Sequence, residues 1–404
     1  MDSLNIKTRI KSFILSSMVS PKNQKIGMEE EVIVYNAYNQ RLPVNRGKSF
    51  SGIDLVRDLK KSFEYYSLEP GGQVEWSSPP RKSLIKLSED QKVHRFRLKE
   101  HLVKNNLKLI SYGVEPKFSP GQVELINEKK YILMDENMKK NGTMGKWMMR
   151  NTASVQINFD FTSERELNEM VFIADCLNPV CAFLFSNSPF KGGEKAKKDN
   201  LRNIIWENTD NIRCKNLIDH GIKDSSRLLD SYIDYVLNVP NIFQLDSEGK
   251  VEDSEGTILD RLINLDKRGE LRDEDINSCL HQIFTNVRIK RFIEVRGSDR
   301  PPLGYEMAPV AFWTGVLTED SIRKKILDEI STWSYEDRIK FNNASLSLDD
   351  NVLTVKDKKY SYWNSWFGEL AISGLKKRGL GEEVLFEKFF KIVTEKGPFS
   401  LQLQ

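Results

Sequence analysis

Three consecutive glutamates, Glu29 to Glu31, lead into a run of apolar and β-branched residues. If this stretch forms a strand, its side chains alternate between two faces, so Glu29 and Glu31 share one face while Met28, Val32 and Val34 share the other. Two carboxylates on one face repel each other unless a cation lies between them, and a divalent metal ion is the simplest such cation. A solvated strand edge is the alternative interpretation of an isolated acidic triplet.

Three further stretches alternate polar and apolar side chains in the same way. The first follows a Pro-Gly-Gly turn and places Glu75 between Val74 and Trp76. The second covers residues 154–161, and the third is expected to be one continuous strand over residues 287–297. The polar faces of the four predicted strands together carry Glu29, Glu31, Glu75, Gln156, Asn158, Glu294 and Arg296.

Four such strands predict an α+β fold, with a curved antiparallel sheet whose concave face is polar and whose convex face is covered by helices. Oxygen ligands without clustered histidine or cysteine favour magnesium over zinc. Magnesium beside arginine suits a nucleoside triphosphate, because metal ions neutralise the phosphates while a guanidinium stabilises the group in transfer. The alternative is a polar interior filled with buried ion pairs, but burying carboxylates without a cation costs on the order of several kcal/mol each.

A second candidate site lies in a predicted helix that begins near Leu201. Arg202 and Trp206 are four residues apart and therefore lie on one helix face, where a guanidinium and an indole make a plausible grip for a carboxylate. The alternative is an ordinary surface arginine stacked on a neighbouring tryptophan.

The chain shows no internal repeat, low-complexity tract or linker, so residues 1–404 are expected to form a single domain, mostly helical beyond about residue 320. Apolar spacing predicts helices over residues 4–18, 54–66, 88–106, 164–185 and 231–239, and a short buried strand over 107–114.

Composition excludes several classes of protein. The net charge is only +3, and no block of like charge indicates a nucleic-acid or membrane tract. The four cysteines have no CxxC spacing, which argues against a zinc site or a disulfide framework. The N-terminal apolar run is too short for a signal peptide, and no stretch is expected to span a membrane. We therefore expect a cytoplasmic protein that binds neither nucleic acid nor membrane.

A set of motifs, taken in their order along the chain, resembles the plant and proteobacterial type of glutamate-cysteine ligase, a carboxylate-amine ligase. The resemblance covers about residues 25–320. The motifs are Gly27-Met28-Glu29-Glu30-Glu31, Leu68-Glu69-Pro70-Gly71-Gly72-Gln73-Val74-Glu75, Met148-Met149-Arg150, Val155-Gln156-Ile157-Asn158-Phe159-Asp160-Phe161, Ser186-Asn187-Ser188-Pro189-Phe190, Ile205-Trp206 and Glu294-Val295-Arg296-Gly297-Ser298-Asp299.

The resemblance implies a glutamine-synthetase-like catalytic fold that uses ATP and Mg²⁺. ATP would phosphorylate the γ-carboxylate of glutamate, and the amino group of cysteine would attack the acyl phosphate in the first step of glutathione biosynthesis. Arg296, Glu29 and Glu294 are then the catalytic residues, while Gln156, Asn158 and Arg296 bind the cofactor. The implied metal ligands are Glu29, Glu31, Glu69, Glu75, Gln156 and Glu294.

The implied substrate-binding residues are Arg202, Trp206, Arg150 and Thr152, with the first two holding glutamate. Near the third strand the chain departs from the plant pattern. Its Asn151-Thr152-Ala153-Ser154 replaces Arg-Thr-Cys-Thr, so the arginine is expected to have moved to Arg150, and Asp135 replaces an earlier arginine. These changes leave open another acceptor amine or, less favoured, a guanidino-kinase-like phosphotransferase. A monomer or homodimer is expected.

Overall fold

The computed structural model describes residues 3–61 and 65–403. Its centre is an antiparallel seven-stranded sheet with the order β10-β11-β5-β1-β3-β2, to which β4 is added by pairing with β1. Two short hairpins, β6–β7 and β8–β9, lie outside this sheet. The strands are β1 (Ile26–Tyr35), β2 (Tyr66–Leu68), β3 (Val74–Ser77), β4 (Lys108–Ile110), β5 (Ser154–Phe159), β6 (Phe190–Lys191), β7 (Glu194–Lys195), β8 (Phe243–Leu245), β9 (Val251–Asp253), β10 (Val287–Ile289) and β11 (Ile293–Asp299).

Helices make up most of the remaining described chain, including all regular structure beyond residue 300. The α-helices are α1 (Ser3–Leu15), α2 (Gly52–Lys60), α3 (Leu84–Lys104), α4 (Lys129–Asn141), α5 (Gly145–Asn151), α6 (Glu164–Leu184), α7 (Leu201–Glu207), α8 (Leu228–Asn238), α9 (Ile258–Lys267), α10 (Asp273–Leu280), α11 (Met307–Leu317), α12 (Asp320–Ile330), α13 (Tyr335–Ala344), α14 (Tyr360–Arg378), α15 (Val384–Lys396) and α16 (Phe399–Gln402). Short 3₁₀ helices are η1 (Pro21–Asn23), η2 (Pro120–Gln122), η3 (Leu217–His220) and η4 (Val355–Asp357).

Strand β1 crosses the middle of the sheet and confirms the predicted alternation. Glu29 lies opposite Ser77 of β3 and Gln156 of β5, and Glu31 lies opposite Glu75. Paired residues of neighbouring antiparallel strands share a face, so these polar side chains lie on the same side of the sheet. Met28 and its partner Ile157 are buried on the other side.

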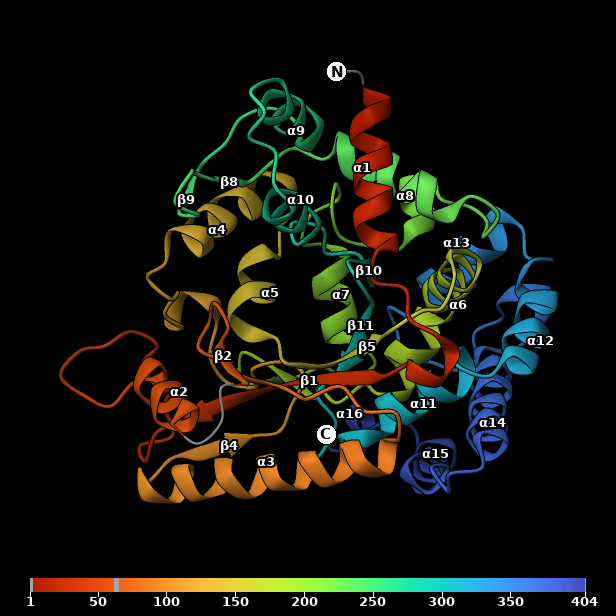
Figure 1. Ribbon diagram of the computed structural model, residues 1–404. Helices are drawn as coiled ribbons and strands as arrows, with labels where there is room; N and C mark the ends of the chain where they lie inside the picture. Colours follow the sequence, from red (N-terminus) through yellow and green to blue (C-terminus); the bar gives the residue numbers. More distant parts are fainter. Residues whose placement is uncertain (1–2, 62–64, 404) are drawn as a thin grey trace.

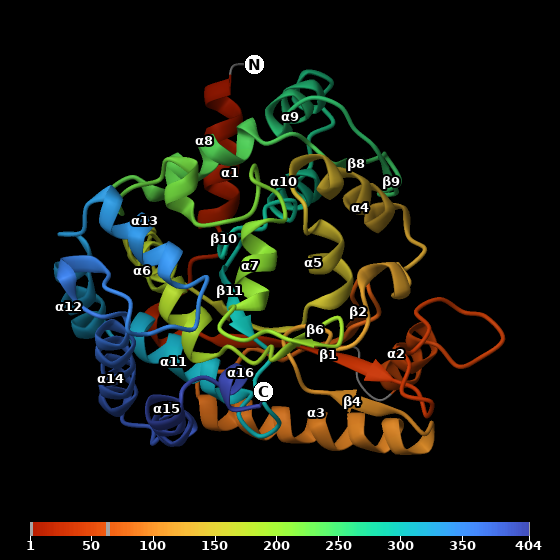
Figure 2. The ribbon, with the colours of Figure 1, turned by 180° about the vertical axis from the view of Figure 1, so that it is seen from behind.

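Helices cover both faces of the sheet, whereas the sequence predicted them on the apolar face only. Helices α6 and α11 pack on β5 and β11, and α3 lies along the same side (Figure 1). Helices α5 and α7 lie on the opposite side of β1 from α3, and the view from behind shows the same arrangement (Figure 2). The polar face is therefore the floor of an interior site rather than a solvent-facing surface.

The stretch from Val287 to Gly297 is a hairpin, not the single strand that the sequence predicted. The backbone N–H of Lys290 donates to the carbonyl of Phe292 at 2.9 Å, and the chain turns back so that Arg288 of β10 pairs with Glu294 of β11. A cation and a carboxylate expected along one strand thus become cross-strand partners.

The helix predicted over residues 54–66 was too long. Helix α2 ends at Lys60, and Tyr66 begins β2, where it pairs with Trp76 of β3. Residues 62–64 of that prediction lie outside the described part of the chain. Hairpin pairing with the next strand outweighs the local helical pattern at its C-terminal end.

The expectation that no segment reaches membrane-spanning length was wrong for one helix. Helix α6 has 21 residues and is apolar enough to cross a membrane by length and composition. However, 94% of its apolar window is buried inside the protein, where it packs against the sheet and against α12 and α13. Its apolar character is therefore explained by its place in the core.

Candidate active site

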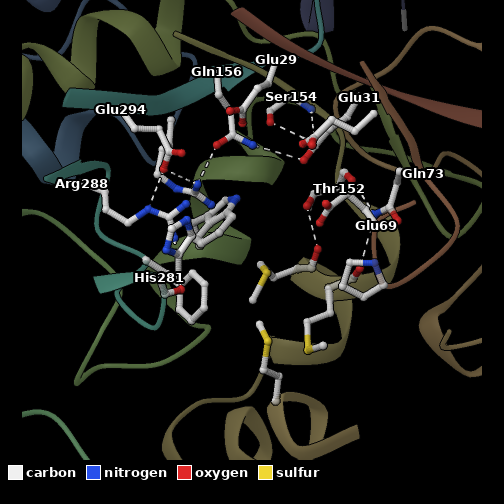
Figure 3. Close-up of a pocket in the computed structure, with 18 of the residues that line it drawn as sticks. Glu29, Glu31, Glu69, Gln73, Thr152, Ser154, Gln156, His281, Arg288 and Glu294 are labelled. Carbon is white, nitrogen blue, oxygen red and sulfur yellow. Dashed lines mark hydrogen bonds and ion pairs between the residues drawn. The ribbon is translucent and has the colours of Figure 1, made fainter. Parts of the chain in front are cut away.

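A cavity lies over the polar face of the sheet and collects most of the predicted site residues (Figure 3). Strands β1, β3, β5 and β11 supply its floor, and helices α4, α5 and α7 supply its walls. The predicted residues that line it are Glu29, Glu31, Glu69, Glu75, Thr152, Gln156, Arg202, Trp206, Glu294 and Arg296.

Five of these lining residues are carboxylates, and four of them repel one another: Glu29, Glu31, Glu69 and Glu75. Burial, together with the charges of Glu31 and Glu29, raises the pKa of Glu69 to about 7. Burial also raises the pKa of Glu75, with Glu69 as the largest charge contribution. Burial raises the pKa of Glu31 too, against the opposing charge of Arg202. Because these buried carboxylates repel one another, the binding of a cation in the cavity would be strongly favourable.

The donor chemistry of the carboxylate group fits a hard divalent cation such as Mg²⁺. Its ligand atoms are oxygens, and the mutual repulsion described above would be relieved by a bound cation. As placed, no three His, Cys, Asp or Glu side chains of the described residues converge closely enough to hold a metal ion. By the chemistry of their oxygen ligands, the residues that would hold Mg²⁺ are Glu29, Glu31, Glu69 and Glu75. This role stays a prediction.

Glu294 stands apart from these four because three cations surround it. Its Oε2 accepts from Arg288 Nε at 2.6 Å and from Arg296 Nη1 at 2.8 Å, and its Oε1 accepts from Lys290 Nζ at 2.6 Å. Burial alone would raise the pKa of Glu294, but the three cations hold it well below its usual range. Both oxygens are therefore engaged by protein cations, and a role as metal ligand would require Glu294 to share them.

The amide of Gln156 bridges a cation and a carboxylate. Its Oε1 accepts from Arg296 Nη1 at 2.6 Å, and its Nε2 donates to Glu31 Oε1 at 3.3 Å. The amide oxygen is the only atom of this side chain that binds a metal ion, and here it is used by Arg296. The structure thus places Gln156 as an orienting link between Arg296 and Glu31.

Arg202 and Trp206 lie together on α7, as the spacing predicted, but Arg202 is buried rather than on the surface. Only 4% of Arg202 is exposed, and Nη2 donates to the carbonyl of Arg296 at 3.1 Å. The indole of Trp206 lies 5.6 Å from Cζ of Arg202 and 5.5 Å from Cζ of Arg296, within cation–π range. Among the described residues, Arg202 forms no ion pair with a carboxylate, and Arg202 Nε and Trp206 Nε1 have no hydrogen-bond partner.

Two predicted residues are not among those that line the cavity. Arg150 points away from it, because Nη2 binds Asp135 at 3.0 Å and Nη1 donates to the carbonyls of Pro120 and Val123. Arg150 therefore does not present a free guanidinium to a substrate. Asn158 shares the polar face with Gln156 and Glu294 but is not part of the cavity lining, and its Nδ2 donates to Glu29 Oε1 at 2.9 Å.

Sequence reasoning missed several lining residues. Arg288 and Lys290 were recognisable in the sequence, since their even spacing from Glu294 places them on the same polar face. The prediction nevertheless assigned neither residue a role in the site. His281 is a neutral ring, because burial lowers its pKa to about 4, and Nδ1 donates to the carbonyl of Asn277 at 2.8 Å. Stretches that were compared with the family pattern contain Pro70, Gln73, Met148, Met149 and Ser154, but these residues were assigned no role. No local pattern marked the others, which are Lys130, Tyr131, Met134 and Phe284.

Comparison with known proteins bears on the family of the chain. The model of glutamate-cysteine ligase family 2 (GCS2) matches residues 25–383. The chloroplastic glutamate–cysteine ligase A of Oryza sativa subsp. indica is 30% identical over 79% of this chain and 67% of that protein. The chloroplastic ligase of Arabidopsis thaliana is 29% identical over 90% of this chain and 71% of that protein.

A solved structure shows that the fold is shared as well. The glutamate–cysteine ligase of Francisella tularensis, crystallised in complex with AMP, matches with a TM-score of 0.57 at 12% identity, over 94% of this chain and 84% of that chain. The family predicted from the order of sequence motifs is thus confirmed by the family model and by the relatives. This chain belongs to glutamate-cysteine ligase family 2.

Proposed function

We propose that this protein is an ATP-dependent ligase that joins the γ-carboxylate of L-glutamate to the amino group of L-cysteine, the first step of glutathione biosynthesis. The proposal rests on one observation, the surroundings of the Arg202 side chain. It is a buried guanidinium with no ion-pair partner among the described residues, and it lies against Arg296 and Trp206. The charges of Asp299 and Glu31 act on Arg202 from beyond ion-pair distance, and its Nε has no hydrogen-bond partner within the described chain, so the guanidinium can still bind an anion. The carboxylate of glutamate is such an anion.

The reaction balances in two steps. First, a γ-carboxylate oxygen of glutamate attacks the terminal phosphorus of ATP, and ADP leaves with the electrons of the broken P–O bond. Second, the amine nitrogen attacks the acyl carbon, the C–N bond forms, inorganic phosphate leaves, and the nitrogen loses a proton to solvent. Charge builds up on phosphate oxygens in both steps, so preorganised cations lower both barriers.

The cationic and the acidic residues of the cavity would serve different parts of this reaction. Arg296, Arg288 and Lys290 converge on Glu294 and form a cationic group that suits phosphate oxygens. Glu29, Glu31, Glu69 and Glu75 are the residues that would hold Mg²⁺, and the metal supplies neutralisation of the triphosphate when bound. Gln156 keeps Arg296 oriented between the two groups.

The test is the dependence of ADP release on each substrate. Purified protein is incubated with ATP and Mg²⁺, with glutamate and cysteine added separately and together, and the product is identified by mass spectrometry. We expect γ-glutamylcysteine and ADP in a ratio of one, formed only when both amino acids are present. ADP formation that needs no glutamate would contradict the proposal and favour the phosphotransferase alternative.

We also propose that the protein works in the cytoplasm as a monomer or homodimer. The relatives named above are chloroplastic enzymes, so location needs its own test. Imaging of a fluorescent fusion in the source cell and the mass of the purified protein in solution decide these two points.

A further inference from the structure

Strand β11 contains a β-bulge at the position of Arg296. Between two regular pairs of β11 with β5, the residues Arg296 and Gly297 lie opposite the single residue Gln156. The extra residue shifts the alternation of side chains along the rest of the strand. Asp299 therefore pairs with Ser154 and lies on the polar side of the sheet, whereas unbroken alternation after Arg296 would have turned it away.

Hydrogen bonds hold the backbone of the bulge on both sides of Arg296. Its N–H donates to the carbonyl of Asn286 at 2.9 Å, and its carbonyl accepts from Nη2 of Arg202 at 3.1 Å. The side chain of Arg296 reaches Gln156 and Glu294 on the floor of the cavity. The bulge therefore joins the arginine proposed to bind phosphate to the arginine proposed to bind glutamate.

Gly297 leaves no room for a side chain behind the bulge, where α6 packs on β11. A Cβ atom added to Gly297 would lie 2.0 Å from Oδ1 and 3.2 Å from Cγ of Asn178, a buried residue of α6. The φ angle of Gly297 is not positive, so space rather than backbone conformation requires a glycine here. A methyl group at this position would have to displace either Asn178 or the strand.

The side chain of Asn178 is buried at this contact without an evident polar role for its oxygen. Asn178 is 2% exposed, and its Oδ1 has no hydrogen-bond partner among the described residues. A buried polar oxygen without a partner is costly, so a residue of this kind needs an explanation. Neither Asn178 nor Gly297 lines the cavity, so neither contacts a substrate there. Their close fit to each other is what remains, and it fixes the back of the bulge.

We propose that Gly297 and Asn178 are positioning residues for the ligase reaction, which fix the bulge so that the guanidinium groups of Arg296 and Arg202 are both held in place for their substrates. This inference rests on the proposed function. Because Arg202 binds the carbonyl of Arg296, a shift of the bulge displaces both guanidinium groups together. A displacement of about 1 Å at a reacting group can lower a rate by about 100-fold.

The first test places a methyl group behind the bulge. Gly297→Ala should lower kcat by about 100-fold and raise the KM for glutamate by about tenfold, while the KM for ATP stays within about threefold of wild type. Gly368→Ala is the matched control, because a Cβ atom at this buried glycine of α14 would lie 2.2 Å from the ring of Phe390, away from the cavity. We expect the control to lose thermal stability but to keep kcat and the three KM values. Wild-type kinetics in Gly297→Ala, or the same kinetic change in the control, would overturn the inference.

The second test removes the side chain that the methyl group would meet. Asn178→Ala makes room for it, so the double variant Gly297→Ala/Asn178→Ala should have a kcat at least about tenfold above that of Gly297→Ala. A double variant slower than both single variants would overturn the inference.

Asn178→Ala alone leaves the bulge less constrained, and we expect a kcat about fivefold lower and a KM for glutamate about threefold higher than in the wild type. This variant carries the test if thermal melts show that Gly297→Ala does not fold, and wild-type kinetic constants in it would overturn the inference. If the wild-type protein shows no glutamate-dependent ADP release, the proposed function fails and this inference falls with it, a result distinct from the kinetic outcomes above.

Discussion

Arg288 and Glu294 face each other across the β10–β11 hairpin, with Arg288 Nε 2.6 Å from Glu294 Oε2. Lys290 and Arg296 complete a group of three cations around this one carboxylate. Glu294 is 1% exposed, and the side chains of the three cations are at most 12% exposed, so this carboxylate balances largely buried charge. The hairpin therefore depends on Glu294 for its folding as well as for any part it takes in the reaction.

Glu294→Gln should lose both activity and stability. Removing the charge leaves three cations close together without their counter-ion, and breaking a buried ion pair on one side costs about 3 to 5 kcal/mol. Urea denaturation followed by circular dichroism measures the free energy of unfolding. Glu29→Gln is the matched control, because Glu29 forms no ion pair among the described residues and accepts one hydrogen bond, from Asn158. We expect Glu29→Gln to lose amide formation but to unfold like the wild type. Equal stability of the two variants would contradict this account.

Arg296→Lys should lower kcat by about 100-fold while the KM for ATP changes less. Nη1 of the guanidinium donates to both Glu294 and Gln156, while Nε has no hydrogen-bond partner in the described part of the chain. A lysine ammonium keeps the charge but has no further nitrogen to offer a phosphate oxygen. Steady-state kinetics with ATP as the varied substrate gives both constants. Arg268→Lys, an exposed site away from the cavity, is the control. A lysine variant with near wild-type kcat would make Arg296 a structural residue.

Arg202→Ala should raise the KM for glutamate by roughly 10- to 100-fold, the effect of losing a charge-assisted hydrogen bond of about 1.5 to 3 kcal/mol. The KM values for ATP and cysteine should hardly change. Varying the three substrates in turn measures this split, with Arg202→Lys as the variant that retains charge. A defect confined to ATP or cysteine would remove Arg202 from the glutamate site.

Without divalent metal, the thermal stability of the protein should fall as pH rises from about 5 to 8. Burial raises the pKa of Glu69 to about 7, above its ordinary value of 4.5. The folded state therefore favours the protonated group, and this stabilisation is complete below pH 4.5 and is lost as pH rises through 7. Measuring Tm across this pH range, with and without Mg²⁺, tests whether the stability falls as the pH rises.

Mg²⁺ should restore the lost stability at pH 8, because it binds the ionised carboxylates of the folded state. Glu69→Gln should show a smaller fall of Tm with pH and a smaller gain from Mg²⁺. A wild-type Tm that rises steadily with pH in the absence of metal would show that Glu69 does not titrate in this way.

The polar floor of the site could be predicted because a strand repeats every two residues. Glu29, Glu31 and Glu75 reach one face through that local rule alone. The same rule could not reveal the hairpin. Arg288 and Glu294 are six residues apart, an even number, so they share a face whether the chain continues or turns back.

Arg202 and Trp206 of the α7 wall were predicted from their spacing, but the walls formed by α4 and α5 could not be, because they depend on tertiary packing. Arg150 looked available for a substrate until the structure placed Asp135, fifteen residues earlier, beside it. The methionines of α4 and α5 have the spacing of ordinary core residues, and only the packing of these helices over the sheet turns them toward the cavity.

Helices α4, α5 and α7 stand over the polar face of the sheet and enclose the place where an acyl phosphate would form. Such a mixed anhydride hydrolyses readily in bulk water, and an enclosed site delays that side reaction. The enclosing helices would then act as a safeguard on ATP, so that little nucleotide is wasted when the amine is scarce and the activated glutamate has to wait for its partner.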